Sequence, residues 1–99
     1  MSRSPDRVEK VMALTLADFH RSLVTLAPGL ALRDGQTEIE IDIGGAGVSI
    51  TFEEQQETML GGLLALPRAR VTLELDGLDN AQRAAFLARF DRAFQRGGG

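Results

Sequence analysis

Three carboxylates alternate with isoleucines in one short segment of the chain. Glu38, Glu40 and Asp42 lie two residues apart, and residues so spaced share one face of a strand, about 7 Å apart. Such carboxylates can bind a divalent cation or do acid–base chemistry. A solvated sheet face, with Arg68 and Arg70 as neighbours, explains the pattern as well. We favour the solvated face and predict no metal site and no catalytic residue here.

His20 is the only histidine, and the chain has no cysteine. A protein metal site needs several ligands, and a catalytic histidine needs a nucleophile and an orienting acid around it. Asp18 and Ser22 are near in sequence but radiate around the predicted helix. We therefore expect a partly exposed histidine, no cofactor and no enzymatic activity.

Three glycines, Gly97, Gly98 and Gly99, end the sequence. Carrier proteins that are activated at their C-terminus end in Gly-Gly, because only an extended tail without side chains can thread the activating enzyme. Gly98 and Gly99 are therefore a candidate carrier tail, activated at Gly99. However, the tail follows a predicted helix, and Gly97 also has the ordinary use of ending that helix. We keep the carrier as the alternative function.

The first third of the chain has two candidate helix starts, one at Ser4-Pro5-Asp6 and one at Thr15, with Asp18 in the capping-box position. Apolar residues recur at helical spacing after Thr15. Residues 8–14 are either a strand or an extension of this helix, and we favour the strand. Pro28-Gly29 ends the helix in either case.

Two alternating runs follow, 37–43 and 48–52, separated by the glycine-rich residues 44–47. A phosphate-binding loop would lead into a helix, so this pattern predicts a β-hairpin. A third strand runs through Val71, Leu73 and Leu75. Asp79 and Gln82 then form a capping box for a last helix, whose apolar face recurs with helical period. Its members are Phe86, Leu87, Phe90, Ala93 and Phe94.

These elements predict a single α+β domain over residues 1–99, with 1–7 and 97–99 flexible. The fold is a two-layer sandwich. An antiparallel three-stranded sheet, with a possible fourth N-terminal strand, is covered on one face by two helices in the order (β)αβββα. The other face should be polar and wet.

Residues 53–67 are the least regular part of the chain. The run 53–57 resembles the start of a helical turn, Gly61-Gly62 would break it, and Pro67 marks a boundary. The leucines of this segment either cap the core or form an exposed apolar patch for a partner. Arginines on one side of the last helix are candidates for an acidic partner surface. The predicted partner-binding residues are Leu60, Leu63, Leu64, Arg89, Arg92 and Arg96.

Composition limits the classes of partner. The net charge is −3, and residues 34–57 hold seven acids and no Lys or Arg, which argues against nucleic acid. The element order resembles a double-stranded-RNA-binding domain, but residues 79–82 lack its lysine cluster. No apolar run is long enough for a membrane span. A polar N-terminus and the absence of cysteine favour the cytoplasm.

Parts of the sequence resemble a group of small uncharacterised bacterial proteins. The likeness rests on Leu66-Pro67-Arg68, Arg70-Val71 and the closing stretch 86–99, which in that group has an "FDRxFQRGGG"-like form. The resemblance implies that the glycines are native, and it assigns no functional residue. The sequence thus predicts a non-catalytic accessory or interaction protein that acts by protein–protein contact or self-association, with a homodimer as the natural version.

Overall fold

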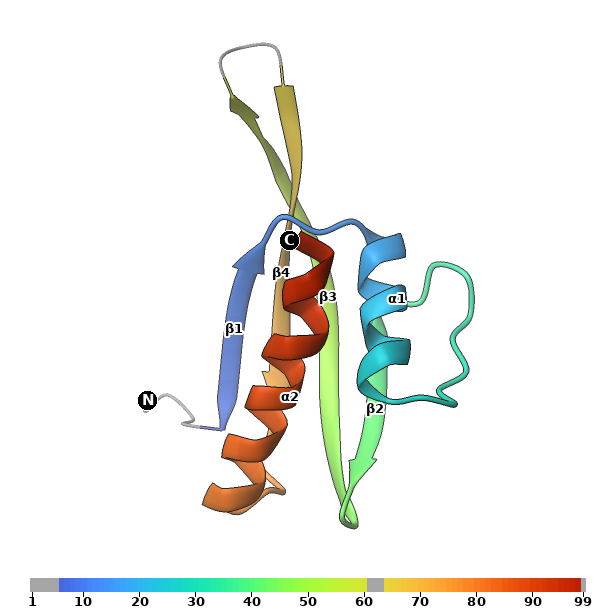
Figure 1. Cartoon of the computed structure of the whole chain (residues 1–99), viewed down its shortest axis with the longest axis vertical. Coiled ribbons are helices and arrows are strands. Elements are labelled where there is room, and N and C mark those ends of the chain that lie inside the picture. The colour runs from blue at the N-terminus through green and yellow to red at the C-terminus, as the bar shows by residue number, and fades with distance from the viewer. Residues whose placement is uncertain (1–5, 61–63, 99) are drawn as a thin grey trace.

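The computed structural model describes the backbone of residues 6–60 and 64–98, and the side chains of residues 6–56 and 66–94. Four antiparallel strands form one sheet in the order β1-β4-β3-β2, and both helices lie on the same face of it (Figure 1). The predicted two-layer α+β sandwich is confirmed, and the fourth strand is present. The elements are β1 (Arg7–Met12), α1 (Leu16–Leu26), β2 (Glu38–Ile43), β3 (Ala46–Leu60), β4 (Leu64–Glu74) and α2 (Asn80–Gly98).

The strand interpretation of residues 8–14 is the right one, because β1 pairs with β4 from Arg7↔Glu74 to Met12↔Ala69. The helix starts at its internal capping signal. Thr15 has an extended backbone, and its hydroxyl accepts a 3.1 Å hydrogen bond from the backbone N–H of Asp18. This side chain satisfies one of the free donors of the first turn and separates strand from helix.

The predicted hairpin joins β2 to β3 through a tighter turn than the four residues expected. Only Gly44 and Gly45 lie outside the strands, with φ angles of 59° and 90°. Two successive left-handed residues form the turn whose twist matches that of the flanking strands, and glycine adopts them without steric cost.

Residues 53–67 differ from the expectation. The run 53–57 is not a helical turn, because β3 continues through it to Leu60. Pro67 is not a boundary, because β4 starts at Leu64 and passes through it. The two strands pair as far as Leu60↔Leu64, so they form one long hairpin whose connection, 61–63, lies outside the described residues.

The core fills the space between the sheet and the two helices. Ile39, Ile50 and Leu73 all point into it, as the alternation predicted, and Phe19, Phe86 and Phe90 meet them from the helices. The rings of Phe19 and Phe52 lie 5.0 Å apart and join α1 to β3, and those of Phe90 and Phe94 stack at 4.1 Å. Burial of these aromatic rings dominates the packing of the two layers.

The last helix begins as its capping box predicts. The Asp79 backbone N–H donates to Gln82 Oε1 at 3.0 Å, and the Gln82 N–H donates to Asp79 Oδ1 at 2.7 Å. Its end differs from the expectation, because α2 includes Gly97 and Gly98 and does not stop at Gly97. The carbonyls of the preceding turn can accept intrahelical bonds from glycine N–H groups as from any other residue, so two glycines at a terminus do not force a stop.

Candidate interaction surface

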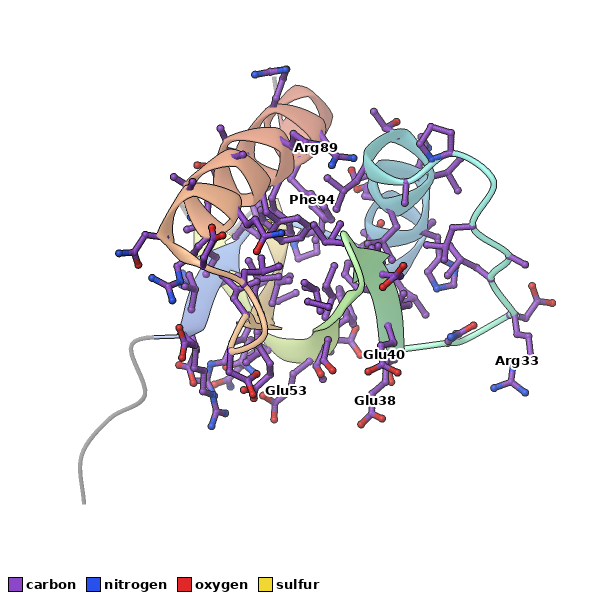
Figure 2. The ribbon with its side chains drawn as sticks, turned by 90° about the horizontal axis from the view of Figure 1, so that it is seen from below. Arg33, Glu38, Glu40, Glu53, Arg89 and Phe94 are labelled. Carbon is purple, nitrogen blue, oxygen red and sulfur yellow. The ribbon has the colours of Figure 1, made fainter. Side chains whose placement is uncertain are left out.

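The face of the sheet opposite the helices is open and charged. Figure 2 shows Glu38, Glu40 and Glu53 pointing away from the helices. In the middle of this face, Arg70 lies 3.5 Å from Glu53 and 4.0 Å from Glu9. Arg7 pairs with Glu9 and with Glu74 at 3.5 and 3.8 Å. These ion pairs are exposed, so each contributes little stability. The positive and negative charges of the paired residues largely neutralise one another.

The acidic residues of β2 do not take part in this lattice. Strand β3 lies between β2 and β4, so Arg70 reaches Glu53 and not Glu38 or Glu40, contrary to the neighbourhood expected from the sequence. Glu38 and Glu40 instead line a shallow open depression of about 470 Å³ with Ser49 and Thr51. In the part of the chain that the structure describes, no three His, Cys, Asp or Glu side chains are arranged to hold a metal ion.

His20 holds a loop in place. Its Nε2 lies 2.7 Å from the Gln36 carbonyl oxygen, and its ring packs against Phe19. The half-buried ring therefore fastens the connection between α1 and β2 to the side of α1, and this contact accounts for the single histidine.

Two of the three predicted surface arginines lie side by side, but they have different roles. Arg89 Nη2 donates a 2.8 Å hydrogen bond to the Leu26 carbonyl, so this arginine caps the C-terminal end of α1. Arg92 is exposed beside it, at a depression of about 430 Å³ that Pro28 and Ala93 also line. The side chain of Arg96 lies outside the described residues. The structure therefore brings Arg89 and Arg92 together between the helices, as Figure 2 shows for Arg89.

The far part of the β3–β4 hairpin extends past both neighbouring strands. Strand β2 pairs with β3 only as far as Glu38↔Thr51, and β1 pairs with β4 only as far as Met12↔Ala69. Residues 53–60 of β3 and 64–68 of β4 therefore pair only with each other. We call these two segments the ribbon, and Figure 1 shows its far end extending past both helices.

The backbone of the ribbon has one open edge on β3. Along a strand, the backbone groups of successive residues point alternately to the two neighbouring strands. The Phe52 N–H donates to the Thr37 carbonyl at 2.8 Å, on the β2 side. Two residues further, the N–H and C=O of Glu54 point the same way but lie beyond the start of β2. The Glu54 carbonyl already accepts a 3.4 Å hydrogen bond from the Gln55 side chain, and its second lone pair can accept from another strand.

The opposite edge of the ribbon is blunted by Pro67. The Leu75 N–H donates to the Asp6 carbonyl at 2.7 Å, so odd-numbered residues of β4 point toward the β1 side. Pro67 belongs to this set and lies past the last pair with β1, so the edge lacks a donor there. The register also shifts between Gln55↔Arg68 and Thr58↔Leu66, where two β3 residues oppose Pro67. Proline is a common device for protecting a sheet edge, whereas the extra residue of the bulge lies in β3 and bends that strand.

An apolar depression lies at the base of the ribbon. Val11, Met12, Ala13, Leu66 and Arg68 line a hollow of about 200 Å³, and Val11 is 49% exposed. Of the leucines predicted as partner-binding residues, Leu60 and Leu64 occupy facing positions at the end of the ribbon, but their side chains lie outside the described residues. Leu63 lies outside them altogether.

Sequence reasoning missed both the open edge and this depression. A signal for the ribbon was present: no glycine or proline interrupts residues 52–60, and Gly61-Gly62 then stands between two apolar runs as Gly44-Gly45 does. The depression joins β1 to β4, and only the strand order brings Val11 beside Leu66.

The candidate carrier tail starts inside a helix. Gly98 is the last residue of α2, and Gly99 lies outside the described residues. An activating enzyme requires an extended tail, so the conformation of Gly98 does not favour the carrier alternative.

Comparisons with known proteins give no relative: no protein-family model, no curated protein and no solved structure matches the chain. Among the described residues, neither helix is long and apolar enough to cross a membrane.

Proposed function

We propose that this chain is a small non-catalytic interaction protein of the cytoplasm, and that it acts by contact of its ribbon with another protein chain. The observation that carries this proposal is the extension of β3 and β4 beyond both flanking strands. A two-stranded ribbon is marginal in water without a third strand or a covering layer. Its persistence as a long paired hairpin, with an apolar depression at its base, is typical of a docking arm.

The chemistry of the other candidate residues supports a role without catalysis. His20 is engaged with a backbone carbonyl, and Arg70 with Glu9 and Glu53. Among the described residues these groups hold the fold together and do not converge on a pocket where a substrate could bind.

A site-specific photo-crosslinking experiment in the native host tests the proposal. A photoreactive phenylalanine analogue at Val11 or Leu66, both at the base of the ribbon, should give a discrete crosslinked product. The same analogue at Ala85, on the exposed face of α2, should give none. The identity of the product is read by mass spectrometry.

A shortened variant provides the second arm. Replacing residues 56–67 by Asn-Gly would join Gln55 to Arg68, which face each other across the hairpin, by a two-residue turn. This variant should keep the circular-dichroism spectrum of a folded α+β domain and lose the crosslink from Val11. Equal crosslinking from Ala85, or an undiminished product from the shortened variant, contradicts the proposal.

A further inference from the structure

The open edge of β3 defines what kind of partner the ribbon can take. We propose that it binds an extended, basic segment of another protein, which adds as a strand alongside residues 53–60 and continues the line of β2. This inference rests on the proposed function and deepens it, because it names the edge, the binding mode and the chemistry of the partner.

The geometry selects β3 over β4 as the docking edge. The Glu54 backbone points outward next to the last ladder bond to β2, from Phe52 to Thr37. The backbone groups of even-numbered β4 residues point toward β3. Past the bulge, Thr58 and Leu60 pair with the even-numbered Leu66 and Leu64, so their backbone groups point toward β4 and those of Met59 point outward. An incoming strand that spans the β3 bulge therefore finds donors and acceptors on both sides of it, at Glu54 and at Met59, whereas Pro67 removes a donor from the other edge. Main-chain hydrogen bonds of this kind supply the affinity in strand addition.

Charge selects the partner. The side chains of Glu53 and Glu54 are exposed on the two faces of β3, and Glu57 follows in sequence; Glu53 also pairs with Arg70 at 3.5 Å, so Glu54 is the acid whose charge an incoming cation meets first. Glu38 stands at the start of β2, where the added strand would end. A second copy paired through the same edge would place these acids against their own equivalents, and like charges that face each other across strands are destabilising. Lysine or arginine on an incoming strand would instead meet acids on both faces.

The test uses defined peptides with the whole chain. The probe is a capped octapeptide that repeats the unit valine-lysine-lysine-valine, which places lysine on both faces of a strand. Its two controls are the same sequence N-methylated at alternate residues on its bonding edge, which keeps the charge but loses the ladder donors, and the same octapeptide with glutamate in place of lysine. Amide hydrogen exchange measured by NMR reports which backbone groups become protected.

The lysine peptide at saturation should slow exchange of the Glu54 and Met59 amides at least tenfold. The inward-facing Glu53 amide should change little, and neither control peptide should protect the edge. Removing two acids from the edge, E53Q/E54Q, should weaken binding about fivefold, as expected for two exposed charge pairs. The matched variant E40Q/D42N, which removes two acids from β2, should weaken it less.

Three results would overturn the inference. Equal binding of the N-methylated peptide would show attraction by charge alone. Protection around Val11 and Leu66 in place of Glu54 would move the site to the apolar depression. Concentration-dependent dimerisation of the free chain, with protection of Glu54 and no peptide present, would make a second copy the occupant. None of these results determines whether the photoreactive analogue at Leu66 gives a crosslinked product. The proposed function can therefore hold even if strand addition fails.

Discussion

Arg83 ties the beginning of the chain to its last helix. Its guanidinium donates through Nη2 to Asp6 and through Nη1 to Asn80 at 3.0 Å, while its Nε is buried without a hydrogen-bond partner. The Arg83 and Asp6 side chains are three-quarters buried, at 25% and 24% exposure, so solvent screens this pair less than it screens the ion pairs of the open face.

Removing this arginine should therefore have a measurable effect on stability. We predict that Arg83→Gln lowers the free energy of unfolding by about 1–2 kcal/mol, the range for a charge-assisted hydrogen bond that is partly desolvated. Urea unfolding measures the change. As a control, Arg21→Gln removes the exposed pair with Asp18 and should change stability by less than about 0.5 kcal/mol. Equal effects of the two substitutions would refute the anchoring role of Arg83.

At the scale of elements, Pro67 keeps the β4 edge of the ribbon inactive. We predict that Pro67→Val restores an outward donor on β4 and makes the protein self-associate, because an unprotected strand edge is a template for pairing. Light scattering over a concentration series should show growth of the apparent mass. Leu66→Val is the control. It also raises strand propensity, but the N–H of residue 66 points toward β3 and not toward the outer edge, so the apparent mass should stay unchanged. A monomeric Pro67→Val protein would show that the proline does not protect the edge.

Local signals in the sequence were sufficient for the starts of the helices and for the first hairpin. Thr15 and Asp79 could be recognised as caps, and Gly44-Gly45 as a turn, because the physical cause of each lies within a few residues. The ribbon could not be found in the same way. Glutamate and glutamine in residues 53–57 favour a helix locally, and pairing with β4 overrides that preference because strand propensity depends on tertiary context.

The candidate site was harder to predict than the fold for the same reason. The solvated face of Glu38 and Glu40 followed from alternation alone, but their separation from Arg70 depended on the strand order. Leu60 and Leu64, which were selected for their apolar side chains, lie in the strands of the ribbon, and their role in partner binding stays a prediction. The apolar pattern did not indicate that Glu54 presents an open backbone edge, because that follows from where β2 begins.

For the whole molecule, the balance of charge sets how strongly copies repel each other. The net charge of −3 at pH 7 falls to zero near the isoelectric point of about 5.0. Because repulsion between copies then vanishes while the ribbon edge and the apolar depression remain, we predict a solubility minimum near pH 5. Measurements of solubility and light scattering from about pH 4 to about pH 8, a range that includes the isoelectric point, should locate this minimum.

The shortened variant separates the two contributions at this pH. Without residues 56–67 it lacks most of the ribbon, and light scattering at its own isoelectric point should rise much less than for the full chain. If it aggregates as strongly as the full chain does, charge neutralisation alone explains the solubility minimum and the ribbon does not contribute.

The pairing of β1 with β4 has a consequence for how the protein is made on the ribosome. Residues 7–12 leave the exit tunnel early, but their partners, 69–74, leave it only after α1, β2 and β3 have done so. Until then the nascent chain exposes the first strand without a neighbour, while the β2–β3 hairpin can already close through its glycine turn. The contact between Asp6 and Arg83 forms later still, because residue 83 follows the last strand of the sheet.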